Sequence, residues 1–227
     1  MKIQKGYGCA FGGGTIINAV AVWKGCAYAV DLKTYAEVCL FEDLSSSEKS
    51  KQAEKSGKIE KNEKIEKNEI KGRIYENPTG NSDLIEKCVS YVLEEFGCFK
   101  KASVLTKSEI PMAGGLKSSS AAANASVIAA LDALGEELNP EEIVKLGVRA
   151  AKEAGVTITG AYDDACASFY GGVAVTDNRK QELIKQEPFE YDVLILNPDT
   201  TAFSSETDVS RSVLMKDLVE TAYDIAL

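Results

Sequence analysis

The chain contains no histidine, and this absence narrows the chemistry available to it. Catalysis of the Ser-His or Cys-His type is excluded, so acid–base work falls to carboxylates, lysines and hydroxyls. An excess of positive charge is also missing, because 26 Lys and Arg stand against 35 Asp and Glu, a formal net charge of −9. A general nucleic-acid binder needs a basic surface for phosphates, so we expect no nucleic-acid partner.

Long apolar runs and closely paired cysteines are missing as well. No uninterrupted apolar segment reaches the roughly 20 residues that a membrane-spanning helix needs, and the N-terminal segment lacks the apolar block of a secretory signal. We therefore expect a cytoplasmic protein without a membrane partner. The 6 cysteines include no CxxC pair, which argues against a zinc site and favours buried, reduced thiols.

The periodicity of apolar residues predicts a mixture of helices and strands. Helices are expected over 82–96, 118–134, 140–154 and 212–227. Strands are expected over 25–32, 33–43, 101–110, 171–177 and 191–199, the last of them buried, and a loop is expected over 157–172. Residues 42–72 are rich in Lys, Glu and Ser and repeat KIEKNE in tandem, which predicts a disordered low-complexity insertion.

A glycine- and serine-rich segment lies between a predicted strand and the alanine-rich predicted helix. Glycines allow backbone amides to surround an anion, and the helix that follows presents free N–H groups and the positive end of its dipole. Serine hydroxyls could bind phosphate oxygens or magnesium. The pattern predicts an ATP-phosphate site, and the alternative is a Gly loop with a Ser N-cap opening a core helix. The segment comprises Pro111, Met112, Ala113, Gly114, Gly115, Leu116, Lys117, Ser118, Ser119, Ser120 and Ala121.

This segment is neither the GxxxxGK[ST] loop nor the GxGxxG fingerprint. It resembles the second motif of the GHMP kinases, P-x-x-x-G-L-x-S-S-[SA], without a gap. The resemblance implies a two-domain α+β fold with the phosphate loop at a helix N-terminus, and it implies ATP and Mg²⁺ as ligands. It also implies Asp164 as catalytic base, with Asp163 left open as the alternative, and Ser119 and Glu153 as magnesium ligands. Without the resemblance, an Asp pair next to a turn is often only a helix cap or an Asx-turn. A glutamate such as Glu153 is more often a solvated helix residue than a metal ligand.

The N-terminal part is similar to archaeal shikimate kinases in GTIINA (14–19), WKG (23–25) and AVDLK (29–33), as is TGAYDDACASFYGG (159–172). This resemblance implies transfer of the ATP γ-phosphoryl group to the 3-hydroxyl of shikimate. Because shikimate carries a carboxylate and three hydroxyls, Thr15, Asn18, Lys24 and Lys33 are candidate substrate ligands. The same Thr and Asn could instead satisfy a turn, and either lysine could lie on the surface.

Two other functions stay open at this point: another GHMP kinase of the homoserine or mevalonate type, and a non-catalytic nucleotide-binding relative. The residues do not predict an oligomeric state. We expect an ATP-binding domain over 1–165 and an incomplete C-terminal domain over 166–227, because the family's third, Gly-rich motif does not occur before Leu227. Reduced stability would follow, whether the sequence is a fragment or a degenerate relative.

Overall fold

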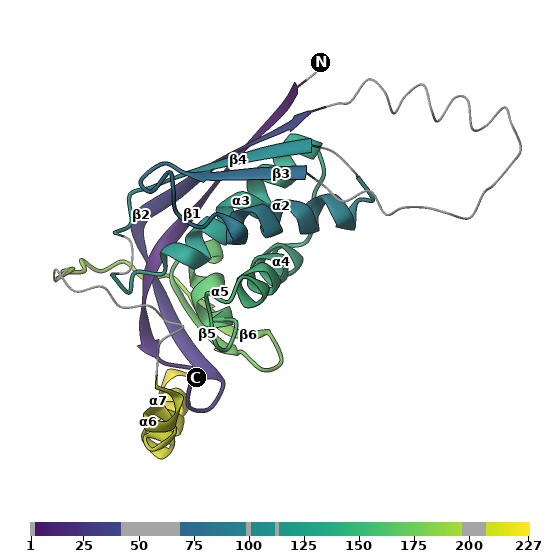
Figure 1. The fold of residues 1–227 in the computed structure, drawn as a ribbon. Coiled ribbons are helices and arrows are strands. Elements are labelled where there is room, and N and C mark those ends of the chain that lie inside the picture. The colour runs from purple at the N-terminus through teal and green to yellow at the C-terminus, as the bar shows by residue number, and fades with distance from the viewer. Residues whose placement is uncertain (1–2, 42–68, 99–100, 112–113, 197–207) are drawn as a thin grey trace, which may run out of the picture.

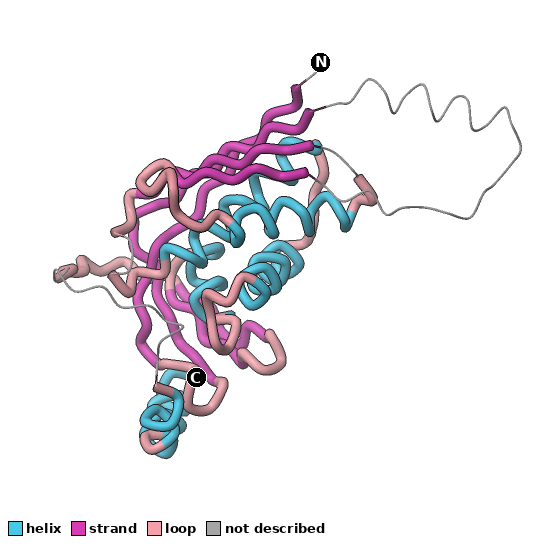
Figure 2. Tube along the Cα trace, in the orientation of Figure 1, coloured by secondary structure: helices cyan, strands magenta, loops and turns pink. Residues whose placement is uncertain are grey.

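A computed structural model describes residues 3–41, 69–98, 101–111, 114–196 and 208–227. Within these ranges the chain forms a six-stranded sheet, and helices α2 to α5 lie together on one side of it (Figures 1 and 2). In chain order, the elements are β1 (Ile3–Ile17), β2 (Lys24–Phe41), β3 (Glu69–Ile74), α2 (Asp83–Glu95), β4 (Lys101–Ser108), α3 (Ser118–Leu134), α4 (Pro140–Glu153), α5 (Tyr162–Tyr170), β5 (Val173–Asp177), β6 (Glu182–Glu187), α6 (Val209–Val213) and α7 (Lys216–Ala226).

The long strand β2 connects the two halves of the sheet. It pairs antiparallel with β1 along most of its length, with β4 from Thr34 to Phe41, and with β5 from Lys24 to Tyr28. The parallel pair β3–β4 and the antiparallel pair β5–β6 extend the sheet at its two ends. The mixed α+β character expected from the sequence is therefore present.

The sheet receives strands from both sides of position 165, the expected end of the ATP-binding domain, and the division into two domains stays a prediction. Position 165 falls inside α5, and β5 and β6 continue the sheet that begins with β1 and β2. The reason is the length of β2, which offers a pairing edge to segments from both halves of the chain. The described residues up to Glu187 thus share one sheet.

Several expected elements differ from those observed. Residues 69–72, expected in the insertion, begin β3 because they pair with β4, while 42–68 lie outside the described residues. The predicted loop 157–172 contains α5, whose apolar residues pack into the core. Residues 191–196 form no strand and expose Leu194 and Leu196, since an apolar run makes a strand only where a free edge receives it. The predicted C-terminal helix is divided into α6 and α7.

Glycines in β1 allow α3 to pack directly on the strand. A Cβ at Gly6 would collide with backbone atoms of Ala129 and Ala133, and one at Gly8 would collide with the backbone of Ala125. The helix contributes mostly alanines to this contact, so two backbones approach where larger side chains would separate them. This close packing fixes α3, and with it the N-terminal end of α3, relative to the sheet.

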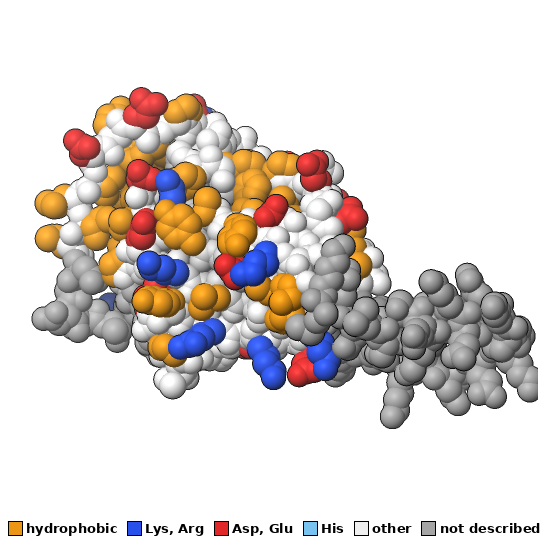
Figure 3. Space-filling view, turned by 90° about the horizontal axis from the view of Figure 1, so that it is seen from above, with side chains coloured by type: hydrophobic (Ala, Val, Ile, Leu, Met, Phe, Trp, Pro, Cys, Tyr) orange, Lys and Arg blue, Asp and Glu red, His pale blue; other side chains and the backbone are white. Residues whose placement is uncertain are grey.

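The opposite face of the sheet carries α7 at one end, where Tyr223 packs against Ile17, Cys26 and Val175, and it is open around Lys5 and Tyr7 at the other end. Side chains alternate along β1, so that Lys5 and Tyr7 point outward, and Figure 3 shows apolar and charged side chains interspersed when the molecule is seen from above. Sheets of antiparallel strands commonly expose one such face. In the described part of the chain, no helix is both long and apolar enough to cross a membrane.

We predict that Gly6→Ala destabilises the protein by about 1–3 kcal/mol, because the added methyl group overpacks the β1–α3 contact. The matched control is Tyr7→Ala, whose side chain is 58% exposed on the open face. Urea unfolding followed by circular dichroism would measure both changes. A Gly6→Ala protein as stable as the parent would contradict the proposed role of this glycine.

Candidate active site

The glycine- and serine-rich loop is anchored against β1. The backbone N–H of Gly13 donates to the carbonyl of Leu116 at 3.1 Å, and the Leu116 side chain is buried. Gly115 has φ of +73° and Lys117 has φ of +62°, so the chain turns twice through the left-handed region before α3 begins. Met112 and Ala113, also expected in the phosphate site, lie outside the described residues.

No side chain among the described residues caps the N-terminal end of α3. Its N-cap residue is Lys117, which has no acceptor on its side chain, and the first turn contains no acidic residue. Ala121 is the first residue whose N–H bonds back to the helix start, to the Lys117 carbonyl at 3.1 Å. Within the described residues, the amides of Ser118, Ser119 and Ser120 are left for an external acceptor. Three free amides and a positive dipole end suit an anion such as phosphate.

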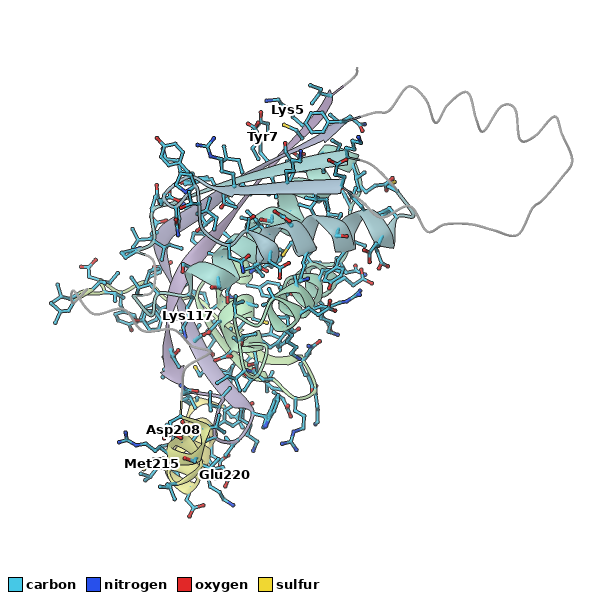
Figure 4. The ribbon with its side chains drawn as sticks, in the orientation of Figure 1. Lys5, Tyr7, Lys117, Asp208, Met215 and Glu220 are labelled. Atoms are coloured by element: carbon cyan, nitrogen blue, oxygen red, sulfur yellow. The ribbon has the colours of Figure 1, made fainter. Side chains whose placement is uncertain are left out.

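An ion pair joins this loop to α5. The Lys117 Nζ lies 3.0 Å from the Asp164 Oδ2, and the two side chains are only 14% and 12% exposed. In Figure 4, Lys117 lies near the middle of the molecule, between Lys5 and Tyr7 on β1 and the labelled residues of the C-terminal helical segment. The left-handed conformation of Lys117 is unusual for a residue with a side chain, and such conformations persist where surrounding structure holds them.

The acidic pair lies in the first turn of α5, where the helix dipole favours negative charge. Burial and the neighbouring carboxylate of Asp163 raise the pKa of Asp164 to about 7, although Lys117 opposes this rise. Burial also raises the pKa of Asp163, against the hydrogen bond from Asn178. Among the described residues, the Asp164 Oδ1 is buried without a hydrogen-bond partner. Asp164 therefore has a carboxylate oxygen available to a ligand and a proton affinity suited to a base near neutral pH.

Asp163 occupies a tightly enclosed position beside it. The Asn178 Nδ2 donates to its Oδ1 at 2.7 Å, and only 3% of Asp163 is exposed. On its other side lies Gly25 of β2, where an added Cβ would come within 2.5 Å of the Asp163 carboxyl group.

A pocket brings five of the expected polar residues together: Thr15, Asn18, Lys117, Asp163 and Asp164. It is lined by Thr15, Asn18, Ala19, Val20, Lys117, Thr157, Ile158, Thr159, Ala161, Asp163 and Asp164. The sequence reasoning missed Thr157 and Thr159, whose hydroxyl oxygens accept from the N–H groups of Gly160 and Ala161 and keep their own hydrogens for other partners. Two threonines two positions apart, just before Gly160 and the Asp pair, were the signal that could have identified them.

Of the described residues in the loop 111–121, Lys117 alone lines this pocket. Outside that loop, the predicted site residues Lys24, Lys33 and Glu153 do not line it. The ammonium group of Lys24 lies over the Tyr223 ring, and that of Lys33 pairs with Asp31 at 3.0 Å. Glu153 is engaged by the Tyr91 hydroxyl and by Arg149, and its side chain is about half exposed. The reason is that Glu153 points along the outer side of α4, toward α2.

A larger hollow of about 530 Å³ runs along α4, past Leu138, Arg149 and Glu153, whereas the acidic pocket encloses only about 60 Å³. We assign the site to the smaller one because chemistry, rather than volume, distinguishes them. The cations of the larger hollow include Lys145 and Arg149, which form pairs within their own helix. The smaller pocket combines a buried carboxylate, a buried lysine and free hydroxyls.

Comparison with known proteins identifies relatives of this arrangement. Residues 83–172 match the GHMP kinases N terminal domain. The shikimate kinase of Methanosarcina acetivorans is 57% identical, and that of Methanosarcina mazei is 53% identical, each over 98% of this chain and 68% of the relative. The chain thus spans about two thirds of their length.

Solved structures share the fold at low sequence identity. A mevalonate kinase from methicillin-resistant Staphylococcus aureus has a TM-score of 0.51 at 23% identity, covering 81% of this chain and 56% of that one. A protein designated MDDEF, in complex with MVAPP, AMPPCP and magnesium, has a TM-score of 0.52 at 17% identity, covering 78% of this chain and 47% of that one. These likenesses concern the fold alone.

We predict that Gly25→Ala lowers stability by about 1–3 kcal/mol and displaces the Asp163 carboxyl group, since the new Cβ lies 2.5 Å from it. Gly147→Ala in α4 is the matched control, because its nearest neighbour would be 3.3 Å away and alanine favours helix. Thermal unfolding would compare the two variants. Equal stability of both would argue against close packing of Gly25 on Asp163.

Proposed function

Because the chain belongs to the archaeal shikimate kinase family, a branch of the GHMP kinases, we propose that it transfers the γ-phosphoryl group of ATP to the 3-hydroxyl of shikimate. One observation carries the proposal at the level of the site. The ion pair between Lys117 and Asp164 brings two features together. Lys117 is the N-cap of α3, and among the described residues that helix end has no side-chain cap and Asp164 has a carboxylate oxygen without a hydrogen-bond partner. A site for phosphate and a site for an acceptor hydroxyl are therefore neighbours.

The chain's residues divide into two groups by role. The amides of Ser118, Ser119 and Ser120 receive the phosphate oxygens, and Gly114 and Gly115 give the loop the space to approach them. Asp164 accepts the proton of the acceptor hydroxyl as that oxygen bonds to the γ-phosphorus and the bond to ADP breaks. Lys117 holds the Asp164 carboxylate in place and adds positive charge beside the transferred group.

The residues at the loop fit ATP with magnesium, the donor pair of this family. The Ser119 residue is exposed in the first turn of α3, so its hydroxyl is available to the metal. In the described ranges no three His, Cys, Asp or Glu side chains converge as a metal-binding group. This suits magnesium, which commonly keeps its waters and binds through substrate phosphates with few protein ligands. When bound, the metal would neutralise charge on the phosphates. Glu153 would have to leave Tyr91 and Arg149 to contribute.

Hydroxyl-bearing and amide side chains around the pocket suit a polyhydroxylated acceptor. Thr15 and Asn18 enter from the end of β1 and the turn after it, while Thr157 and Thr159 enter from the loop before α5. Lys117 is the one cationic residue lining this pocket among the described residues. Lys24 and Lys33 would need new side-chain conformations to reach a carboxylate there. A cytoplasmic location belongs to the same proposal, because ATP is the phosphoryl donor.

We predict that Asp164→Asn lowers kcat for shikimate phosphorylation by about 10²–10⁴-fold while ATP-magnesium still raises the melting temperature. The amide keeps the shape of the side chain but cannot take the proton. Glu136→Gln, an exposed carboxyl-to-amide change just after α3, is the control and should leave kcat unchanged. Coupled ADP-release assays would compare shikimate, mevalonate and homoserine as acceptors. Turnover of either of the others in preference to shikimate would contradict the substrate assignment.

We also predict an acidic limb in the pH profile of kcat/KM for shikimate. The base must be ionised to act, and the pKa of Asp164 is raised to about 7. The rate should therefore fall tenfold per pH unit below about 7 and level off above it. A profile that stays flat down to the ordinary aspartate range, near pH 4, would show that Asp164 is not the base.

A further inference from the structure

A buried network of hydrogen bonds surrounds Asp163 on the side away from Lys117. Asn178 follows β5 directly and is 1% exposed. Its Nδ2 donates to the Asp163 Oδ1 at 2.7 Å, and its Oδ1 accepts from the Asp163 backbone N–H at 3.2 Å. Asn178 thus contacts both the side chain and the backbone of Asp163.

The orientation of the Asn178 amide is fixed by a third residue. The Thr176 hydroxyl donates to the Asn178 Oδ1 at 2.7 Å, and Thr176 is fully buried. Because two donors converge on this oxygen, the amide nitrogen has to face Asp163. The backbone N–H of Asn178 donates to the Trp23 carbonyl at 2.7 Å, which fixes the residue to the turn before β2. No part of this network is used by the proton transfer described above.

We propose that Asn178 is a positioning residue, which holds Asp163 as a fixed negative charge and thereby makes Asp164 the carboxylate that receives the proton. This inference rests on the proposed function for its kinetic consequence, although not for its structural one. Burial raises the pKa of Asp163, and the Asn178 amide opposes this rise, because a buried donor oriented by Thr176 and directed at a carboxylate oxygen favours the ionised form. With Asp163 ionised, the neighbouring Asp164 holds its proton more tightly.

In the part of the chain that the structure describes, three charged or titratable groups act on the pair. Lys117 faces it from the start of α3, Cys26 from β2, and Cys166 from α5 itself. Lys117 lowers the pKa of both carboxyl groups, whereas Asp163 raises that of Asp164. Removing the Asn178 donor would raise the pKa of Asp163 and leave it protonated. Asp164 would then lose a repelling neighbour, and its pKa would fall.

The test is the isosteric change Asn178→Leu, with two readouts. The acidic limb of the kcat/KM profile should move to lower pH by about one unit, and kcat should fall several-fold because the base is weaker, while KM for ATP stays unchanged. Carbon-13 NMR titration of the aspartate carboxyl groups should show the same downward shift for Asp164 without any substrate. Failure of shikimate turnover in the parent protein would overturn the proposed function, and the NMR titration would still decide the role of Asn178.

Two further variants complete the experiment. Thr176→Val should shift the Asp164 titration in the same direction but less, since the amide remains and only its orientation is released; this variant carries the test if Asn178→Leu does not fold. Asp163→Asn should also lower the Asp164 midpoint, and Asn178→Leu should add nothing in that background. Thr106→Val, a buried threonine change in β4, is the control and should move no midpoint. An unchanged Asp164 midpoint in folded Asn178→Leu or Thr176→Val protein would overturn the inference.

Discussion

Helices α3 and α5 direct their N-terminal ends toward the same pocket, and the buried ion pair between Lys117 and Asp164 holds those ends together. Opposite charges removed from water attract strongly, and removal of one partner from such a pair typically costs about 3–5 kcal/mol. A second contact joins α3 to α5 deeper in the core, where the Asn124 side chain donates a hydrogen bond to the Ala165 carbonyl at 2.9 Å. The positive dipole ends of the two helices and the negative charge of the acidic pair stabilise each other at this place.

The sheet explains why this arrangement is rigid. Because β1 has glycines where α3 crosses it, the helix backbone packs on the strand, and the glycine- and serine-rich loop is held by the hydrogen bond between Gly13 and Leu116. Gly25 of β2 and Asn178 after β5 enclose Asp163 from two sides. The position of the loop thus depends on β1, and that of the acidic pair depends on β2 and β5. Both sides are fixed by the same long hairpin.

Local sequence pattern was enough to predict α3 and the glycine- and serine-rich loop before it, because both are specified by residues close together in the chain. The functional interest of the acidic pair came from the resemblance to the GHMP kinases. Thr15 and Asn18 were predicted from the resemblance, and the structure places them in the pocket with Asp163 and Asp164. Asn178 could not be predicted in this way, since its contact with Asp163 exists only through the pairing of β5 with β2. The direction of the Glu153 side chain could not be predicted from the sequence either, because it depends on a hydrogen bond from Tyr91 of another helix.

The central claim is that the uncapped N-terminal end of α3 binds the phosphates of ATP beside Asp164. Backbone amide NMR during titration with ATP-magnesium tests it most directly. The account predicts that the amide signals of Ser118, Ser119 and Ser120 shift most, together with that of Lys117. If these amides stay unchanged while signals elsewhere respond, for example along α4 beside Arg149, the nucleotide binds at another place and the account is contradicted.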